Sequence, residues 1–507
     1  MTHDKDRYIE VGGDDAPHDA GRKGKAKAKL KADDTPREPR AMGYSVDAMN
    51  REWCVVLMRS RLVIIREAGD GPLGRCVNVL GMDAFRAWSL NKVTEKKDRD
   101  GKITVETWAD AWLRSPMRRE YTGIEFRPGD DAKTTPGYMN MWRGFTVAPV
   151  FKKNGYAIFR DHLFNNVCEG DEHLFRWVFG WLAHLVQKPR ERIGTALVLR
   201  GTMGAGKSKM GEVVGSLIGP HYFAVDDPRY VIDRFNAHLV GCLLLQAEEA
   251  FWAGDKVAEG RLKGLVTSHV QMIEEKGVDA IAVDNYVRIM ITSNEDWVVP
   301  AGMKERRWCV LDVNPRCAQN NEYFREMDEQ LDAGGREALL FDLLHFDLSG
   351  IDLRRIPRTS GLLEQKLHSL DSVTSWWYHR LESGAPTKGL DRWPEALPVD
   401  TLFQDYIETS ERIGIRRRAE MTSFGIKMRR LVPGLTAERR TWEIHSGTFK
   451  RCRCYVLPDL ASCRAALEEM LEQAIVWTRD ADAEDEADQP SEGDGPAQGV
   501  DDGSGEG

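Results

Sequence analysis

A glycine-rich run near the middle of the chain has the residue types that bind phosphate groups. Residues 201–208 spell GTMGAGKS and match the pattern G-x-x-x-x-G-K-[ST] in full. Glycines let backbone N–H groups converge on phosphate oxygens, and a helix N-terminus adds the positive end of its dipole. An apolar segment typical of a strand precedes the run, and a helical pattern over residues 207–218 follows it. This context favours a phosphate-binding loop over a glycine-rich turn that matches by chance.

The loop predicts a site for ATP and Mg²⁺. Lys207 is expected to reach the β- and γ-phosphates, and Ser208 is expected to ligate Mg²⁺. The whole run is a candidate nucleotide contact: Gly201, Thr202, Met203, Gly204, Ala205, Gly206, Lys207 and Ser208.

Two acids follow the next apolar strand pattern, in GCLLLQAEEA. Nucleotide hydrolysis needs one acid to hold the metal and its water shell, and another to polarise the attacking water. We assign Glu248 to Mg²⁺ and Glu249 to the general base, and the reverse order stays open. Two solvated acids at a strand end are the alternative without a function.

A third strand pattern, VRIMITSN, ends in Asn294, whose neutral amide can bind the γ-phosphate or the attacking water. The sequence KERRW then places Arg306 and Arg307 ahead of a further strand. An arginine can offset the negative charge that develops during phosphoryl transfer. We expect one of the pair to act on a neighbouring subunit's site and the other to be a surface residue. Arg306 is favoured because it stands farther from the strand and has more reach.

The apolar strand patterns TALVLR, CLLLQ and VRIMITS predict the fold of residues 189–315. Continuous apolar runs of this length suit parallel strands covered by helices on both faces. We therefore expect an α/β core of the P-loop, AAA+-like type. The surrounding regions are assigned as a disordered basic arm (1–40), an α+β domain (41–150), a helical segment (151–188), a helical connector (316–392), a compact helix-and-strand domain (393–471) and a disordered acidic tail (472–507).

Charge and composition restrict the class of protein. The net charge is −9, yet residues 479–507 hold eleven acids against one arginine, so the rest of the chain is near neutral. No apolar run approaches the roughly 18 residues of a membrane span, and the N-terminus lacks a signal-peptide core. None of the nine cysteines forms a C-x-x-C pair, which disfavours a zinc ribbon or a disulfide framework. We expect a cytoplasmic protein that has no membrane partner.

The motifs and their order resemble the ATPase domain of superfamily 3 helicases, in the phage and plasmid primase-helicase type that is related to the poxvirus primase-helicase. The matching segments are GTMGAGKS, LLLQAEEAFW, LKGLVTSHVQMIEEKGVDAIAV, MITSNEDW and KERRW. The resemblance implies a replicative helicase that forms a ring, expected to be a hexamer, and moves on single-stranded or forked DNA. It also makes Lys263 and Lys276 candidate DNA contacts, with Lys276 near the tip of a hairpin. For both lysines an ordinary solvated side chain is the alternative.

Many proteins of this type also carry a primase, and here the chain departs from them. A D-x-D ahead of the loop, Asp98 and Asp100, falls in a polar turn rather than on an apolar strand. We therefore expect no primase active site in this chain, and a separate primase or polymerase is a candidate partner.

The 393–471 region resembles the winged-helix module that often ends such proteins. It is rich in basic residues, including Arg429 and Arg430, which we name as candidate DNA contacts. A docking module for another protein is the alternative. For the whole chain, the alternatives to a helicase are a non-helicase AAA+-type ATPase that remodels origins or loads a partner, and a DNA-binding accessory whose ATPase has decayed.

Overall fold

The computed structural model describes most of the chain between residues 43 and 477. The described residues are 43–58, 61–67, 77–97, 100–129, 133–227, 229–232, 236, 239–249, 256–275, 278–414, 417–445 and 447–477. The expected N-terminal arm, and all of the expected acidic tail beyond residue 477, lie outside them. Within this part of the chain, no helix combines the length and the apolar character needed to cross a membrane.

The chain divides into two compact units, Met1–Met49 with Asp83–Met117 and Asn50–Met82 with Arg118–Gly507. The first unit is built around an antiparallel hairpin and short helices: β4 (Val93–Lys97), β5 (Ile103–Thr107), α2 (Met82–Trp88) and α3 (Trp108–Leu113). Its core holds Phe85 and Trp112, whose rings meet edge to face at 5.6 Å between centroids. The stretch 41–150, expected as one domain, is thus shared between the two units.

The second unit begins with a small four-stranded sheet in the order β3-β2-β1-β6. Its strands are β1 (Trp53–Met58), β2 (Arg61–Glu67), β3 (Val77–Leu80) and β6 (Glu120–Tyr121), and α1 (Val46–Glu52) precedes them. A parallel pair, β7 (Gly123–Glu125) and β8 (Tyr138–Asn140), follows. Cys54, Val56, Ile65 and Met139 form the buried core of this region.

The centre of the second unit is a five-stranded sheet in the order β10-β11-β14-β9-β15. Every neighbouring pair is parallel. The strands are β9 (Ala196–Arg200), β10 (Tyr222–Val225), β11 (Leu244–Glu248), β14 (Arg288–Ser293) and β15 (Trp308–Asp312). All residues of β9 and β14 are buried, as expected for strands covered on both faces. The α/β class and the parallel sheet predicted from the apolar runs are therefore confirmed.

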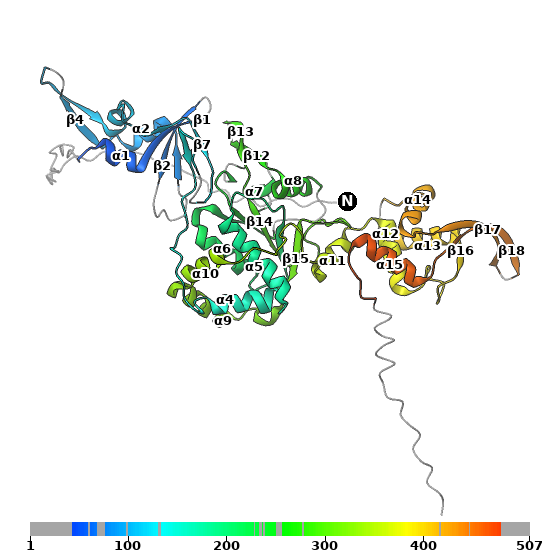
Figure 1. The fold of residues 1–507 in the computed structure, drawn as a ribbon. Coiled ribbons are helices and arrows are strands. Elements are labelled where there is room, and N and C mark those ends of the chain that lie inside the picture. Colours follow the sequence, from blue (N-terminus) through cyan, green and yellow to red (C-terminus); the bar gives the residue numbers. More distant parts are fainter. Residues whose placement is uncertain are drawn as a thin grey trace, which may run out of the picture. The chain divides into compact units, whose positions relative to one another are not determined.

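Helices pack around this sheet to close a large apolar core. α6 (Lys207–Ile218) contacts β10, β11 and β14, and α10 packs on α5 (Figure 1). The other helices of the core are α4 (Ala157–Asp161), α5 (Glu172–Gln187), α9 (Asn321–Gln330) and α10 (Arg336–His345). A π-helical turn, His162–Val167, continues α4, and Asp171 caps α5 by accepting bonds from the N–H groups of His173 and Leu174.

A hairpin comes between β11 and β14 in the chain, and the ends of these two strands carry candidate catalytic residues. It consists of β12 (Val270–Glu275) and β13 (Val278–Asp284), paired from Val270 with Asp284 to Glu275 with Val278. Two short helices precede it, α7 (Arg229–Ile232) and α8 (Lys256–Thr267). The strands thus flank the position at which a hairpin turn was predicted, and the turn residues themselves, 276 and 277, lie outside the described residues.

The C-terminal part of the second unit has a core of its own. Its elements are α11 (Ser360–His368), α12 (Ser372–Ser383), β16 (Ala396–Pro398), α13 (Val399–Arg412), α14 (Met421–Leu431), β17 (Thr436–His445), β18 (Thr448–Val456) and α15 (Leu460–Leu471). The strands form an antiparallel sheet in the order β16-β18-β17. Trp376, Trp377, Tyr406 and Phe424 lie in the core, so it begins with α12 and includes part of the expected 316–392 connector.

Gly215 gives a test of the packing between α6 and the sheet. A Cβ at this position would lie 2.3 Å from Cγ of Tyr222, whose hydroxyl donates a hydrogen bond to Gln246 at 2.9 Å. Gly215→Ala should therefore destabilise the fold by about 1–3 kcal/mol, because the tethered ring cannot move aside. Gly260→Ala is the matched control, since this helical glycine has nothing within 4 Å of its Cβ position. Removing a helical glycine should stabilise by about 0.5–1 kcal/mol. Thermal unfolding measures both, and equal melting temperatures for wild type and Gly215→Ala would contradict the packing.

Candidate active site

A cavity of about 820 Å³ opens where the central strands end. Its walls come from four places: the glycine-rich loop with the start of α6, the ends of β10 and β11, the end of β14, and the segment that follows β15. The lining residues are Met203, Gly204, Gly206, Lys207, Ser208, Lys209, Glu212, Asp226, Glu248, Glu249, Thr292, Ser293, Asn294, Gln319, Asn321 and Phe324. Parallel strands direct their carboxyl ends to one edge of a sheet, and this edge is where α/β proteins bind ligands.

The loop 201–208 connects β9 to α6 through a backbone path that only glycine follows easily. Gly201, Gly204 and Gly206 have φ angles of 143°, 77° and 88°. At Gly206 a Cβ would also lie 2.7 Å from ring atoms of both His162 and Phe324. Backbone conformation and lack of space therefore both require glycine, and the chain can pass close to a ligand there.

Lys207 is the first residue of α6, and only 8% of its surface is exposed. Its Nζ donates to the carbonyl oxygens of Gly201 and Thr202, at 2.8 Å each, and to Oδ1 of Asn294 at 2.7 Å. Burial lowers the pKa of this ammonium, and the negative charge of Glu249 partly offsets that effect. Among the described residues, no carboxylate forms an ion pair with Lys207. A buried cation without a carboxylate partner fits an anionic ligand such as a phosphate chain.

Asn294 joins Lys207 to Glu249. Its Nδ2 donates to Oε1 of Glu249 while its Oδ1 accepts from Lys207. Glu249 adopts a positive φ of 48°, and its N–H donates to the carbonyl of Thr292 on β14 at 2.9 Å. A non-glycine residue in this conformation is uncommon and is held by its surroundings. The ends of β9, β11 and β14 thus bring together three of the candidate catalytic side chains.

Glu248 and Ser208 both line the cavity beside this group. Glu248 accepts a hydrogen bond from Nε2 of Gln246 at 2.6 Å. Mg²⁺ prefers oxygen ligands and usually keeps several waters and the phosphates of its substrate. Within the described part of the chain, no group of three or more His, Cys, Asp or Glu side chains could hold a metal ion. One hydroxyl and one carboxylate next to a phosphate site nevertheless fit a Mg²⁺ ion that arrives with nucleotide.

Arg306 and Arg307 lie at the amino ends of the central strands, whereas the glycine-rich loop lies at their carboxyl ends. They precede β15, and the carbonyl of Arg307 accepts from the N–H of Ala196 at the start of β9. The loop follows the far end of β9, where Arg200 pairs with Asp312. A strand rises about 3.3 Å per residue, so the two ends of β15 are roughly 13 Å apart. The structure therefore does not bring these arginines to Lys207 within one chain.

The two arginines also differ in their own contacts. Arg307 forms an ion pair with the buried carboxylate of Glu305 at 3.0 Å. Arg306 is exposed, and its side chain has no hydrogen bond or ion pair with the rest of the described chain. The sequence favoured Arg306 only for its distance from the strand, and the contacts add a second difference between the two arginines.

Lys263, Arg429 and Arg430, the candidate DNA contacts that the structure describes, do not line the cavity. Lys263 forms an ion pair with Glu259 one turn earlier on α8, and Lys276 lies outside the described residues. Arg429 and Arg430 occupy the last turn of α14, are exposed, and have no side-chain partner within the described ranges.

This chain is similar in sequence and in structure to known proteins. Residues 199–307 match a family described as a family of unknown function, DUF5906. The DNA primase-polymerase of Nitratiruptor phage NrS-1 is 24% identical over 216 residues, which cover 42% of this chain and 28% of that protein. The chain is thus distantly similar to a phage DNA primase-polymerase.

Two apo structures of the NrS-1 C-terminal region share the fold. They have a TM-score of 0.57 and 15% sequence identity, and cover 81% and 83% of this chain and 98% and 100% of their own. The family match runs from the end of β9 to Arg307 and so contains the loop, both acids, Asn294 and the arginine pair.

Sequence reasoning missed two buried side chains behind the loop. Gln246 is fully buried in β11, where it accepts from the hydroxyl of Tyr222 at 2.9 Å and donates to the carbonyl of Ser208 at 3.3 Å. A Cβ at Gly211 would lie 1.6 Å from its Oε1, so that glycine makes room for it. The signal was present, since an amide interrupts the apolar run LLLQA.

The other is His162, which lies in the π-helical turn before α5. Its Nε2 is 3.2 Å from the carbonyl of Gly206, and Nδ2 of Asn166 is 2.9 Å from its Nδ1. Burial lowers its pKa. No local pattern marks it, because it comes 39 residues before the loop in an ordinary helical stretch.

The contacts of the two acids predict different effects of removing each charge. Glu249→Gln should still bind ATP but hydrolyse it about 10²–10⁴-fold more slowly, because an amide cannot accept a proton from water. Glu248→Gln should instead raise the Mg²⁺ concentration needed for half-maximal activity. Steady-state ATPase assays over a Mg²⁺ titration, with binding of a fluorescent ATP analogue, measure both. Normal hydrolysis by Glu249→Gln together with loss in Glu248→Gln would reverse the assignment.

Proposed function

We propose that this chain is an ATP-dependent DNA helicase that forms a ring and moves on single-stranded DNA. The observation that carries the proposal is the hydrogen-bonded series Lys207–Asn294–Glu249 at the mouth of the cavity. It combines a buried cation for phosphate with an amide and a carboxylate, which are the groups that hydrolysis of a nucleoside triphosphate requires. The distant similarity to a phage DNA primase-polymerase supports a role in DNA replication.

In the proposed mechanism, residues 201–208 hold the phosphates of ATP through their backbone N–H groups. Lys207 would exchange its carbonyl partners for phosphate oxygens, and Ser208 and Glu248 would hold Mg²⁺. The ion supplies Lewis-acid stabilisation of the charge on the phosphates. Asn294 keeps its amide between the γ-phosphate and Glu249. Glu249 accepts the proton of the attacking water.

The arginine that stabilises the transition state would come from a neighbouring subunit. Head-to-tail contacts between identical chains close into rings when the rotation allows it. In such a ring, the edge that carries Arg306 would face the next chain's cavity, which its own chain cannot reach. Arg306 is the better candidate because Glu305 already neutralises Arg307. We propose a homo-oligomer, with a hexamer as the expected form.

DNA would contact two parts of the ring. The β12–β13 hairpin would present Lys276 to the strand in the central channel, where repeated lysines follow a phosphate backbone without selecting sequence. The C-terminal elements have the order of a winged-helix module, with α14 as the exposed helix and β17–β18 as the wing. Arg439 and Arg453 face each other across that wing. Like charges directly opposite are destabilising, and an anion between them removes the repulsion.

We also propose a partner and a cellular location for this chain. A separate primase or polymerase is the proposed partner. The host cytoplasm is the proposed location, as for other phage or mobile-element replication proteins of this type.

Hydrolysis and unwinding test the function directly. The wild-type chain should hydrolyse ATP with Mg²⁺ and displace a strand from forked DNA, and Lys207→Ala should do neither, because the β- and γ-phosphates lose their cation. Phosphate release and a fluorescent strand-displacement assay measure the two activities. DNA-stimulated hydrolysis without strand displacement would indicate a remodelling or loading ATPase, and no hydrolysis at all would leave only a DNA-binding accessory.

Mixed rings test the shared site. Arg306→Ala and Lys207→Ala should each be inactive alone, with Arg306→Ala losing on the order of a thousandfold in turnover. A mixture should recover part of the activity, because some interfaces then pair an intact loop with an intact arginine. Arg307→Ala is the matched control and should keep most of its activity alone. If no mixture recovers activity, in rings shown to exchange subunits, the arginine does not act between subunits.

A further inference from the structure

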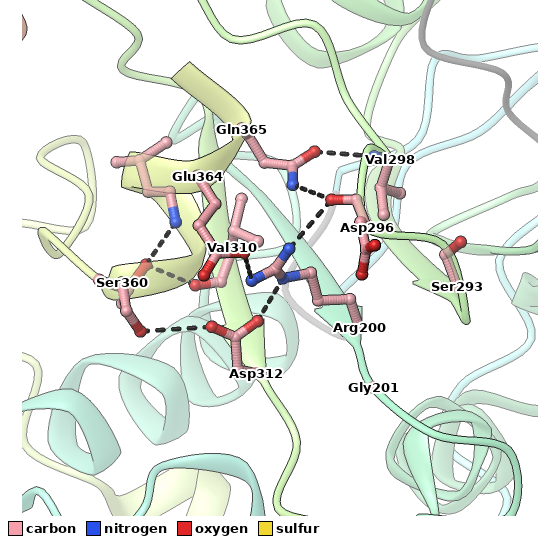
Figure 2. A network of polar contacts seen from close by, with 12 residues as sticks. Arg200, Gly201, Ser293, Asp296, Val298, Val310, Asp312, Ser360, Glu364 and Gln365 are labelled. Atoms are coloured by element: carbon pink, nitrogen blue, oxygen red, sulfur yellow. Dashed lines mark hydrogen bonds and ion pairs between the residues drawn. The ribbon is translucent and has the colours of Figure 1, made fainter. Parts of the chain in front are cut away.

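Arg200, the residue immediately before the loop, carries a buried guanidinium bound by three different segments. It donates from Nε to Asp312 at the end of β15, from Nη1 to the carbonyl of Asp296 at 2.9 Å, and from Nη2 to Glu364 on α11. Figure 2 shows Arg200 between these partners. The two carboxylates raise the pKa of the guanidinium, against the effect of burial. The loop's starting point is thereby tied to α11.

Gln365 on α11 binds the segment that follows Asn294. Its side chain is fully buried, and its Oε1 accepts from the N–H groups of Val298 and Val299 at 2.7 and 3.1 Å. Its Nε2 donates to the carbonyl of Asp296 at 2.5 Å, the same oxygen that Arg200 binds (Figure 2). One amide therefore satisfies three backbone groups of a single irregular segment.

α11 packs closely against β15 of the central sheet. Thr359 caps the helix by accepting from the N–H of Leu362 at 3.2 Å, and its hydroxyl also donates to the carbonyl of Val310. A Cβ at Gly361 would lie 3.0 Å from both carboxylate oxygens of Asp312. Ser360 donates to Asp312 at 3.2 Å. The helix thus has one register against β15.

α11 is also bound to the far end of the chain's described part. Lys366, the residue after Gln365, is buried and donates from Nζ to the carbonyl of Leu471, the last residue of α15, at 2.6 Å. Gln473 donates to the carbonyl of Thr359 at 2.8 Å. Neighbouring residues of one helix therefore contact the nucleotide-site segment and the C-terminal core.

The segment that Gln365 binds, residues 294–307, carries candidate catalytic residues at both ends. Residues 294–307 begin at Asn294, which contacts Lys207 and Glu249, and end at the arginine pair. Gln365 and Ser369 hold it from the middle, since Ser369 accepts from the N–H of Ala301 at 3.0 Å. A displacement of this segment would move the amide of the chain's own site and the arginine offered to the next chain together.

We propose that Gln365 is a positioning residue, which sets Asn294 and Arg306 through the 294–307 segment and couples both to the C-terminal core through α11. The proposal rests on the proposed ATPase function and deepens it. Arg200 has the same role from the side of the loop. Neither side chain touches the nucleotide, and the coupling acts through the backbone groups that they bind.

The test compares variants that differ only in these hydrogen bonds. Gln365→Met keeps the length of the side chain and removes all three bonds, whereas Gln365→Glu keeps an oxygen that can accept from Val298 and Val299 and loses the donor to Asp296. The matched control is Gln404→Met, because Gln404 is an exposed glutamine on α13 that donates to Glu408 one turn away at 3.0 Å. For each variant we would measure affinity for a fluorescent ATP analogue with Mg²⁺, turnover without DNA, DNA affinity and the melting temperature.

The expected pattern separates positioning from a purely structural role. Turnover should fall on the order of a hundredfold in Gln365→Met and less in Gln365→Glu, because misplacement by about 1 Å has effects of that size. Nucleotide and DNA affinities should stay within about twofold of wild type, and Gln404→Met should match wild type throughout. A folded Gln365→Met with normal turnover, or a parallel loss of nucleotide affinity and turnover, would overturn the proposal.

A measurement on the wild-type chain covers the case in which the variants do not fold. Hydrogen exchange at the amides of Val298 and Val299 should be slow without ligand, and adding the ATP analogue should change it together with exchange in α11. Unchanged exchange in both places at saturating nucleotide would also overturn the proposal. Wild-type ATPase activity, and its loss in Lys207→Ala, are measured beside these tests. An inactive wild type refutes the proposed function, whereas an active wild type with insensitive Gln365 variants refutes only the coupling.

Discussion

The positive charge of Lys207 is buried in a place where backbone carbonyls and one side-chain amide surround it and where, within the described part of the chain, no carboxylate forms an ion pair with it. Burying a charge without an ionic partner is unfavourable, and the lowered pKa of this lysine expresses that. The surrounding structure must hold the ammonium in this state until an anion arrives. The glycine-rich loop, the amide of Asn294 beside the ammonium and Gln246 behind the loop all contribute to this.

The parallel sheet makes this arrangement possible. Because neighbouring strands run the same way, residues far apart in the chain come to one edge, with Glu248 and Glu249 from β11 and Asn294 from β14 beside the loop of β9. The same geometry sends the start of β15, with Arg306, to the opposite edge. Under the proposed function, the chain would complete its site with an arginine from a second copy, so the proposed ring would follow from strand direction as much as from any single residue.

α11 connects the segment beside the candidate active site to the C-terminal core. Its buried side chains Gln365 and Lys366 bind backbone groups of the 294–307 segment and of α15. Buried hydrogen bonds of this kind fix one arrangement, because breaking one leaves a desolvated group without a partner. Under the proposed function, α11 would then connect the nucleotide site at one edge of the sheet with the DNA contacts of the C-terminal elements.

The sequence alone determined the parts that depend on local chemistry. The spacing in GTMGAGKS, the apolar runs of the central strands and the polar residues at their ends predicted the loop, the α/β class and the parallel sheet, because strand burial and glycine conformation are properties of short segments. It also brought Lys207, Glu249 and Asn294 together as candidates, since parallel strands end at one edge.

Only the tertiary structure decided which side chains meet across long separations. Arg200 is bound to Glu364, Gln365 binds Val298, and His162 lies against Gly206, and no local pattern announces these pairs. The same holds for the ion pair of Arg307 with Glu305, which the sequence did not predict when it favoured Arg306 for its reach alone. Such pairs depend on how finished elements pack, which the order of residues within one element does not encode.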